Sequence, residues 1–138
     1  MANDFRKSQS AVKVSADAMA PLFDSGYLYI YDSTMPDGTS AALTTQSQIV
    51  RLQFGATAFS TAALGYPVSL SANAITAAAS TFSSTATWFR ATGNTTTVLL
   101  AQGTAGTAGC DMTLNSAQIS AGASVSVSSL VMTFPTSS

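Results

Sequence analysis

The sequence contains no histidine and no glutamate, and it has a single cysteine, Cys110. Without an imidazole, a Ser-His-Asp triad and a His-based zinc site are excluded. A glycosidase-like pair would need two of the aspartates to converge on a cleft, and nothing in their spacing indicates this. One cysteine excludes an intrachain disulfide framework and a Cys-based metal cluster. These absences argue against an enzyme and predict that stability comes from packing or from partners.

Charge is also scarce. Charged residues usually make up about a quarter of a globular domain, but here they make up 8%, and the net charge is -1. Alanine, serine and threonine supply nearly half of the 138 residues, so hydroxyl and methyl groups must cover much of the surface. The length fits one domain with one core. Low charge weakens repulsion between copies, which favours a subunit of an assembly; a small secreted sandwich with a Ser/Thr-rich surface remains the alternative.

Long apolar runs are missing as well. No stretch approaches the roughly 20 apolar residues of a membrane span, and the first residues lack the apolar region of a secretory signal. We therefore expect synthesis in the bacterial cytoplasm and no membrane contact. Three of the five basic residues, Arg6, Lys7 and Lys13, lie near the amino end, either on a solvated helix face or on an arm reaching an acidic partner. Three cations are too few for useful nucleic-acid binding.

The amino-terminal part has helical periodicity. Between Ser8 and Phe23, the apolar residues Val12, Ala16, Met19, Ala20 and Phe23 follow steps that place them on one helical face. Ser8 or Ser10 is suited to cap the start, and Pro21 breaks or kinks the last turn. The pattern predicts a helix that ends near Ala20.

From Gly26 onward the periodicity changes to that of strands. Alternation of apolar with polar or aromatic residues and turn signals such as Pro36-Asp37-Gly38 predict about eight strands. This number is typical of a β-sandwich or jelly roll. We expect two parts, an amino-terminal arm or helix (1–25) and a β-sandwich (26–138). The expected strands cover 26–32, 49–54, 56–59, 66–70, 84–91, 96–102, 111–115 and 123–134.

Four local features refine this prediction. Gly93-Asn94 marks a hairpin between two strands that we expect at the centre of the sheet. Residues 72–80 predict an irregular connection or a short strand, and Pro67 places its strand at an edge or at a strand start. A change of alternation near Ser128 and Ser129 predicts a β-bulge. The segment Gly103–Gly109 has the composition of a flexible surface loop.

Aromatic residues are the candidates for an interface. Tyr27, Tyr29 and Tyr31 alternate along one strand and project from one face, either as an exposed interface row or as core beneath the helix. Trp88 and Phe89 must point to opposite faces, so at least one belongs to the core and the other is a candidate for an interface. The candidate interface set is completed near the amino end by Phe5, Arg6, Lys7 and Lys13.

Other sites are less well supported. Asp32 and Asp37 flank a loop and could bind calcium, but they lack the dense carboxylates of a dedicated calcium loop, and turn hydrogen bonds explain them more simply. A Ser-Lys dyad through Lys7 or Lys13 has no accompanying oxyanion signature. The glycine-rich segment does not end in the Lys-Ser/Thr of a phosphate loop. We therefore expect no catalytic residue, no metal and no cofactor.

Several motifs then follow one another in a distinctive order. They are GYLYIYDSTMP (26–36), ANAI (72–75), TATWFR (85–90), GTAG (103–106), DMTLN (111–115) and ISAGASVSVSS (119–129). Together they resemble a family of small virion proteins of tailed phages, similar to the jelly-roll cement proteins of short-tailed phages. The resemblance covers residues 8 to about 134 and carries no site residue with it.

The resemblance implies a structural role in the virion. It implies a jelly-roll fold, a homodimer bound to the outer surface of the phage head, and the major capsid protein as partner. A neck or tail component, or a carbohydrate- or host-binding module in which the tyrosines and Trp88 stack on sugars, are the alternatives. An Asp- or Ser-based hydrolase is the remaining class.

Overall fold

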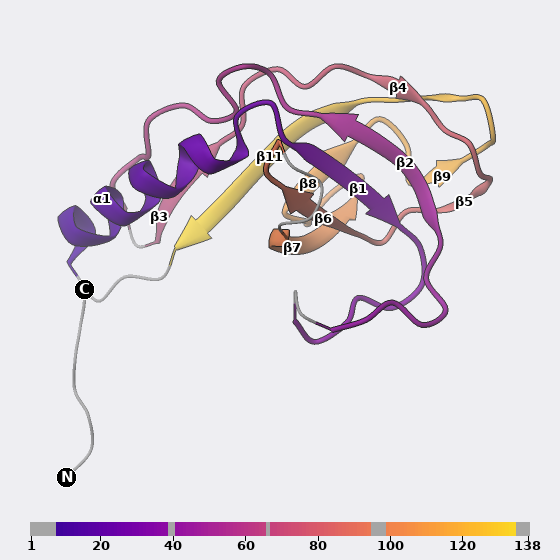
Figure 1. Ribbon diagram of the computed structural model, residues 1–138, viewed down its shortest axis with the longest axis horizontal. Coiled ribbons are helices and arrows are strands. Elements are labelled where there is room, and N and C mark those ends of the chain that lie inside the picture. Colours follow the sequence, from indigo (N-terminus) through magenta and orange to yellow (C-terminus); the bar gives the residue numbers. More distant parts are fainter. Residues whose placement is uncertain (1–7, 39–40, 66, 95–98, 135–138) are drawn as a thin grey trace, which may run out of the picture.

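The computed structural model describes residues 8–38, 41–65, 67–94 and 99–134. Most of the secondary structure is β, with one α-helix at the amino end, so the predicted all-β class with a short helix is confirmed. Figure 1 shows α1 (Gln9–Met19) at one side of the molecule, beside the end of the long strand β11 (Val127–Phe134).

The helix begins and ends where the sequence predicts. The Ser8 hydroxyl caps it by accepting a hydrogen bond from the Ala11 N–H at 3.2 Å, which satisfies one of the free donors of the first turn. Pro21 falls in the short 3-10 helix η1 (Ala20–Phe23) that follows, because proline cannot continue an α-helix. Val12 and Ala16 are buried. Among the described residues, the helices are too short to cross a membrane.

Seven strands form one sheet in the order β2-β1-β6-β7-β8-β11-β3, and four two-residue strands form two small pairs, β10-β4 and β5-β9. The strands of the large sheet are β1 (Tyr27–Tyr31), β2 (Gln48–Gln53), β3 (Val68–Ser71), β6 (Trp88–Thr92), β7 (Leu99–Gly106), β8 (Met112–Leu114) and β11. The short strands are β4 (Ala78–Ala79), β5 (Ser84–Thr85), β9 (Gln118–Ile119) and β10 (Ser124–Val125).

Several local predictions are confirmed. The β6–β7 hairpin lies at the centre of the sheet, although part of its turn (95–98) lies outside the described residues. The strand that follows Pro67 is the edge strand β3, and residues 72–80 form a connection that contains only β4. The ladder of β11 with β8 shifts register between Val127 and Ser129, where the β-bulge is expected. The predicted strand over 56–59 is reduced to one bridge, Phe59 with Ala72.

The prediction of a loop from Gly103 to Gly109 is wrong in its first half, because β7 continues to Gly106. The glycines there allow close packing. A Cβ at Gly103 would lie 2.7 Å from Asp111 Oδ2 and 2.9 Å from Phe89 Cε1, and one at Gly106 would lie 2.9 Å from Cys110 Sγ. Glycine in a strand is a sign of close approach as well as of flexibility, and composition alone does not separate the two.

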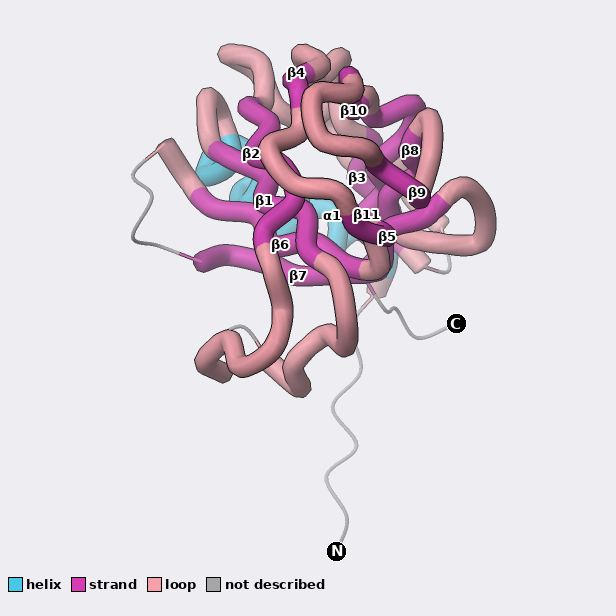
Figure 2. Tube along the Cα trace, turned by 90° about the vertical axis from the view of Figure 1, so that its right-hand side faces the viewer, coloured by secondary structure: helices cyan, strands magenta, loops and turns pink. Residues whose placement is uncertain are grey.

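The sheet consists of two antiparallel parts, β2-β1-β6-β7 and β8-β11-β3, that join at the parallel pair β7–β8. Both parts contribute to one core, in which Leu28, Phe89 and Leu130 are buried together. Phe23, from η1, lies in the same core and contacts Phe59 edge to face at 5.3 Å between ring centroids. Figure 2, turned by 90°, shows α1 behind the strands and the two small pairs toward the other side. The arrangement is a sandwich closed at one side by the helix.

Gly26 marks the tightest junction of this fold. Its N–H donates to Phe23 O at 2.8 Å and its carbonyl accepts from the Phe54 N–H at 2.8 Å. A Cβ at this position would lie only 2.1 Å from the carbonyl oxygen of Thr92. This oxygen belongs to the backbone of β6, which is held in place by the hydrogen bonds of the sheet, so only glycine fits at position 26.

We expect Gly26→Ala to lower the free energy of unfolding by about 1–3 kcal/mol or more, because a methyl group is forced against backbone. Gly38→Ala is the matched control, since a Cβ there meets nothing within 4 Å. Urea unfolding followed by fluorescence of Trp88 measures both variants. Equal midpoints for the two variants would contradict the tight junction.

Candidate interaction surface

The predicted interface residues separate into three groups. Phe5, Arg6 and Lys7 lie outside the described residues. Lys13 is on α1, and the aromatic residues are on β1 and β6. The structure therefore does not gather the described members into one patch.

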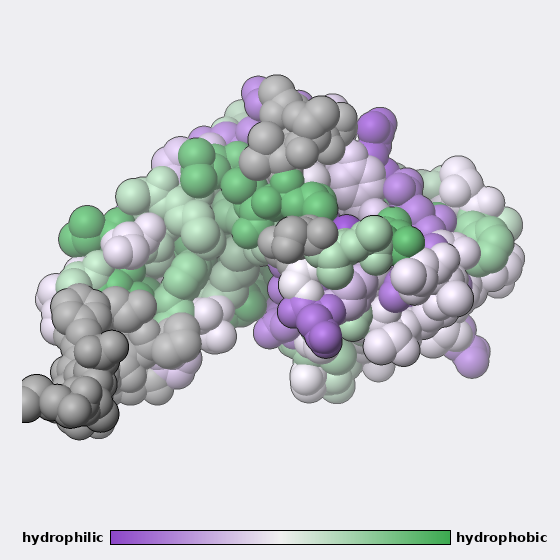
Figure 3. All heavy atoms as spheres, turned by 60° about the horizontal axis from the view of Figure 1, so that its bottom comes forward, coloured by the Kyte–Doolittle hydropathy of each residue, from purple (hydrophilic) through white to green (hydrophobic). Residues whose placement is uncertain are grey.

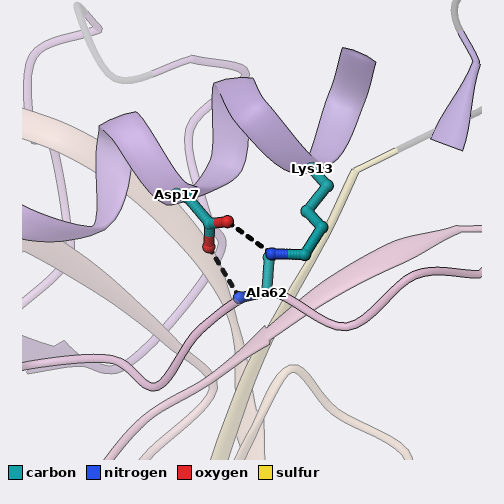
Figure 4. Close-up of polar contacts among 3 residues, drawn as sticks. All are labelled: Lys13, Asp17 and Ala62. Carbon is teal, nitrogen blue, oxygen red and sulfur yellow. Dashed lines mark hydrogen bonds and ion pairs between the residues drawn. The ribbon is translucent and has the colours of Figure 1, made fainter. Parts of the chain in front are cut away.

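Lys13 has a partner within its own helix. Its Nζ lies 2.6 Å from Oδ2 of Asp17, one turn later, and Asp17 Oδ1 accepts the Ala62 N–H at 2.7 Å (Figure 4). The carboxylate thus joins the helix to the loop that precedes β3. In the single chain, the Lys13 ammonium is paired with the Asp17 carboxylate.

Tyr31 and Trp88 are buried, with 7% and 0% of their surface exposed. Their rings stack at 4.5 Å between centroids, and the indole N–H donates to Asp32 O at 2.9 Å. Arg90 lies over the Trp88 ring at 5.2 Å, and its Nη2 donates to Ala41 O at 2.7 Å. The prediction of an exposed role for Tyr31 and Trp88 is corrected: the loop after β1 covers them, and Trp88 has no face free for a sugar.

The accessible part of the tyrosine row is therefore Tyr27 and Tyr29, both partly exposed. On the neighbouring strand, Arg51 pairs with Tyr29 and Gln53 pairs with Tyr27. The Arg51 guanidinium lies 4.6 Å from the centroid of the Tyr27 ring, and the two tyrosine rings are 6.4 Å apart. We call Tyr27, Tyr29, Arg51 and Gln53 the tyrosine–arginine surface. It borders a hollow of about 270 Å³.

Asp24 and Asp32, the second of which is a candidate for calcium binding, accept hydrogen bonds from backbone N–H groups of other segments. Asp24 Oδ1 accepts the Ala58 N–H at 2.8 Å, and Asp32 Oδ1 accepts the Ser47 N–H at 2.6 Å. Asp32 Oδ2 also accepts the Ser84 hydroxyl at 2.8 Å. Within the described ranges, no group of three or more potential metal-ligating side chains is present. The sequence signal for this role was the position of these aspartates beside turns and strand ends.

These contacts change the pKa of three groups. At Asp17, the Lys13 ammonium and the Ala62 N–H hold the pKa below its ordinary 3.8. At Asp32, burial raises the pKa, but hydrogen bonds from Ser47 and Ser84 lower it more, so that it also lies below 3.8. Burial raises the pKa of Tyr31, and the positive charge of Arg90 opposes part of this rise.

Large apolar side chains are exposed at several places on the described surface. Val14, Leu64 and Leu22 have 70%, 58% and 55% of their surface exposed. Figure 3 shows that hydrophobic residues gather on the side of the molecule that holds α1, next to a hollow between two lobes. Helical periodicity gave the buried face of α1 correctly but did not predict that Val14 is the large apolar side chain exposed on its outer face.

A second hollow, of about 320 Å³, lies between β7 and β11. Met19, Phe89 and Met132 supply its apolar lining, and Asp111 supplies its charge. The sequence could not reveal this hollow, because its walls come from five separate segments whose proximity depends on strand order.

Comparison with known proteins adds no assignment. No protein-family model matches the chain, and no curated protein and no solved structure matches it either. A function has therefore to be inferred from the residues and geometry of this chain.

The lowered pKa values of Asp17 and Asp32 predict loss of stability in acid. A carboxyl group whose folded pKa lies below its unfolded pKa stabilises the fold above about pH 4, and this stabilisation is lost as the pH falls through the folded pKa. We expect the melting temperature to fall between pH 5 and pH 2, as measured by circular dichroism.

Asp17→Asn tests the contribution of one group, because it keeps an acceptor for Ala62 but loses the ion pair with Lys13. Its melting temperature should lie below that of the unaltered protein at pH 7, and the difference should narrow toward pH 2. A constant difference over this range would contradict the assignment.

Proposed function

We propose that this chain is a structural protein of a phage virion. It binds the outside of the head as a cement or decoration protein and strengthens contacts between subunits of the major capsid protein. It is made in the host cytoplasm and works as a homodimer, without a catalytic group or a cofactor. The ordered motifs between Gly26 and Ser129, which resemble the cement-protein family, support this proposal.

The observation that carries the proposal is the tyrosine–arginine surface. Tyrosine and arginine are enriched where proteins meet, because they bury much area and still offer hydrogen bonds. Tyr27 and Tyr29 are held by β1, and Arg51 is held by β2 through a regular antiparallel register. A partner subunit would therefore meet side chains that are already ordered, which lowers the entropy cost of binding.

The way the chain uses its charges supports the same role. Asp17, Asp24 and Asp32 each accept a backbone N–H from another segment, and Arg90 is buried. A partner that covers the protein therefore desolvates few charged groups, so the desolvation free energy lost on binding a shell over a large area is small. Modest contacts, repeated by the symmetry of the shell, add up to strong attachment.

The test is cosedimentation of the purified protein with shells of the corresponding major capsid protein that lack it, followed by a shell-disruption melt. We expect saturable binding and a higher disruption temperature. Failure to bind would overturn the cement role and would favour a neck, tail or host-recognition component.

Substitutions on the tyrosine–arginine surface locate the contact. Tyr27→Ser combined with Arg51→Ser should weaken binding to shells by about tenfold or more, as expected for aromatic and arginine anchors. Leu64→Ser, at an exposed position near the opposite edge strand β3, is the control and should bind normally. Equal binding by both variants would place the contact on another face.

A further inference from the structure

The hollow between β7 and β11 combines a carboxylate with an apolar lining. It lies where these two strands separate, just before β8 begins at Met112. Asp111 contacts both strands at this point, because its carboxylate accepts the N–H of Thr104 on β7 and its carbonyl accepts that of Val131 on β11. The volume of the hollow, about 320 Å³, falls within the range of small-ligand sites, which begins at about 300 Å³. We call it the Asp111 hollow.

The Asp111 carboxylate is held in place by neutral groups. Its Oδ2 accepts the Thr104 N–H at 3.0 Å and the Thr104 hydroxyl at 3.2 Å. The ion pair found in the described part of the chain joins Lys13 to Asp17, so no described cation balances the charge of Asp111. This side chain is also exposed. The hollow therefore presents an ordered negative charge that a ligand from solution can reach.

Apolar walls adjoin this charge directly. A Cβ at Gly103 would lie 2.7 Å from Asp111 Oδ2 and 2.9 Å from Phe89 Cε1, so the oxygen and the aromatic ring lie side by side against the backbone of β7. Met19 of α1 and Met132 of β11 line the hollow too, and both pack on the core while staying partly exposed. Thioether side chains adapt their shape to an apolar ligand.

The backbone of β7 supplies a second acceptor. The Thr104 N–H points away from β6 and toward Asp111. Backbone groups alternate in direction along a strand, so the carbonyl of Gln102, which also lines the hollow, points to the same side. Among the described residues this carbonyl has no strand partner there, because β8 pairs with β7 only from Ala105 onward.

We propose that the Asp111 hollow binds a primary ammonium group on a straight alkyl chain, either a small free amine or the side chain of a lysine. A carboxylate and a carbonyl only accept hydrogen bonds, and a primary ammonium has three donors and no acceptor. The ammonium supplies the missing positive charge at Asp111, and its methylene groups lie on Met19, Phe89 and Met132. The site is separate from the tyrosine–arginine surface, so the proposal holds whether or not the protein binds a shell.

The test is a titration of the nitrogen-15-labelled full chain with n-butylammonium chloride at pH 7 and constant ionic strength. The amide signals of Gly103, Thr104 and Thr133 report binding. Butanol and butyrate have the same chain with a neutral or a negative head group, and are the matched probes. We expect saturable shifts with butylammonium and binding of the other two that is weaker by about tenfold or more. Equal responses to the three probes, or no saturable response to butylammonium, would overturn the proposal.

Asp111→Asn separates the charge from the shape of the hollow, because the amide oxygen still accepts the Thr104 N–H. We expect this variant to bind butylammonium about tenfold more weakly or less well still, since the hydrogen bond loses its charge. Asp37→Asn is the matched control, because it removes an exposed carboxylate in the loop after β1 and should leave the affinity unchanged. An equal loss in both variants would show attraction by net charge alone and would contradict a built site.

Chain length tests the apolar walls, and a blocked lysine identifies the source of the ammonium. From ethylammonium to butylammonium, the affinity should rise by about threefold for each added carbon, because each methylene group leaves water. An affinity that does not change with chain length would overturn the proposal. N-acetyl-lysine N-methylamide carries the same ammonium on a peptide backbone. If it binds as tightly as butylammonium, the ligand is the lysine of a partner; if it binds much more weakly, the ligand is a free amine.

Discussion

Trp88 and Phe89 follow each other on the central strand β6, so their side chains point to opposite faces of the sheet, and both are buried. Because this strand carries a large apolar side chain on each face, other elements must cover the sheet on both sides. The second part of the sheet, with α1 and η1, covers Phe89, and the loop after β1 covers Trp88. Covering both faces of the sheet accounts for the position of the amino-terminal helix and for the length of the loop after β1. It also accounts for the burial of Arg90.

The sequence predicted the elements whose causes are local. The Ser8 cap, the proline after α1, the alternation in β1 and the central hairpin each depend on neighbouring residues, and each lies where expected. The features that were missed depend on distant residues. From the sequence alone, Gly103 is predicted to be flexible, because the contacts of Phe89 and Asp111 with this position depend on the fold. Trp88 is a candidate for exposure for the same reason, because the loop that covers it is placed only by the fold.

The same distinction between local and distant causes applies to the candidate interaction surface. Alternation correctly placed the three tyrosines of β1 on one face, but the exposure of each depends on what its neighbours on β2 and β6 present. Tyr31 pairs with Trp88 and is covered, whereas Tyr27 pairs with Gln53 at the outer strand and stays accessible. The roles of Asp17 and Asp24 likewise required the positions of Ala62 and Ala58, more than thirty residues away in the chain.

The join between β7 and β8 consists of only two paired positions. The two parts of the sheet are therefore joined by their shared core and by a hydrogen-bonded ladder that is shorter than the ladders within either part. Amide protons at this joint should accordingly exchange with solvent sooner than those of β6, because a short ladder opens locally at a lower free energy than a long one.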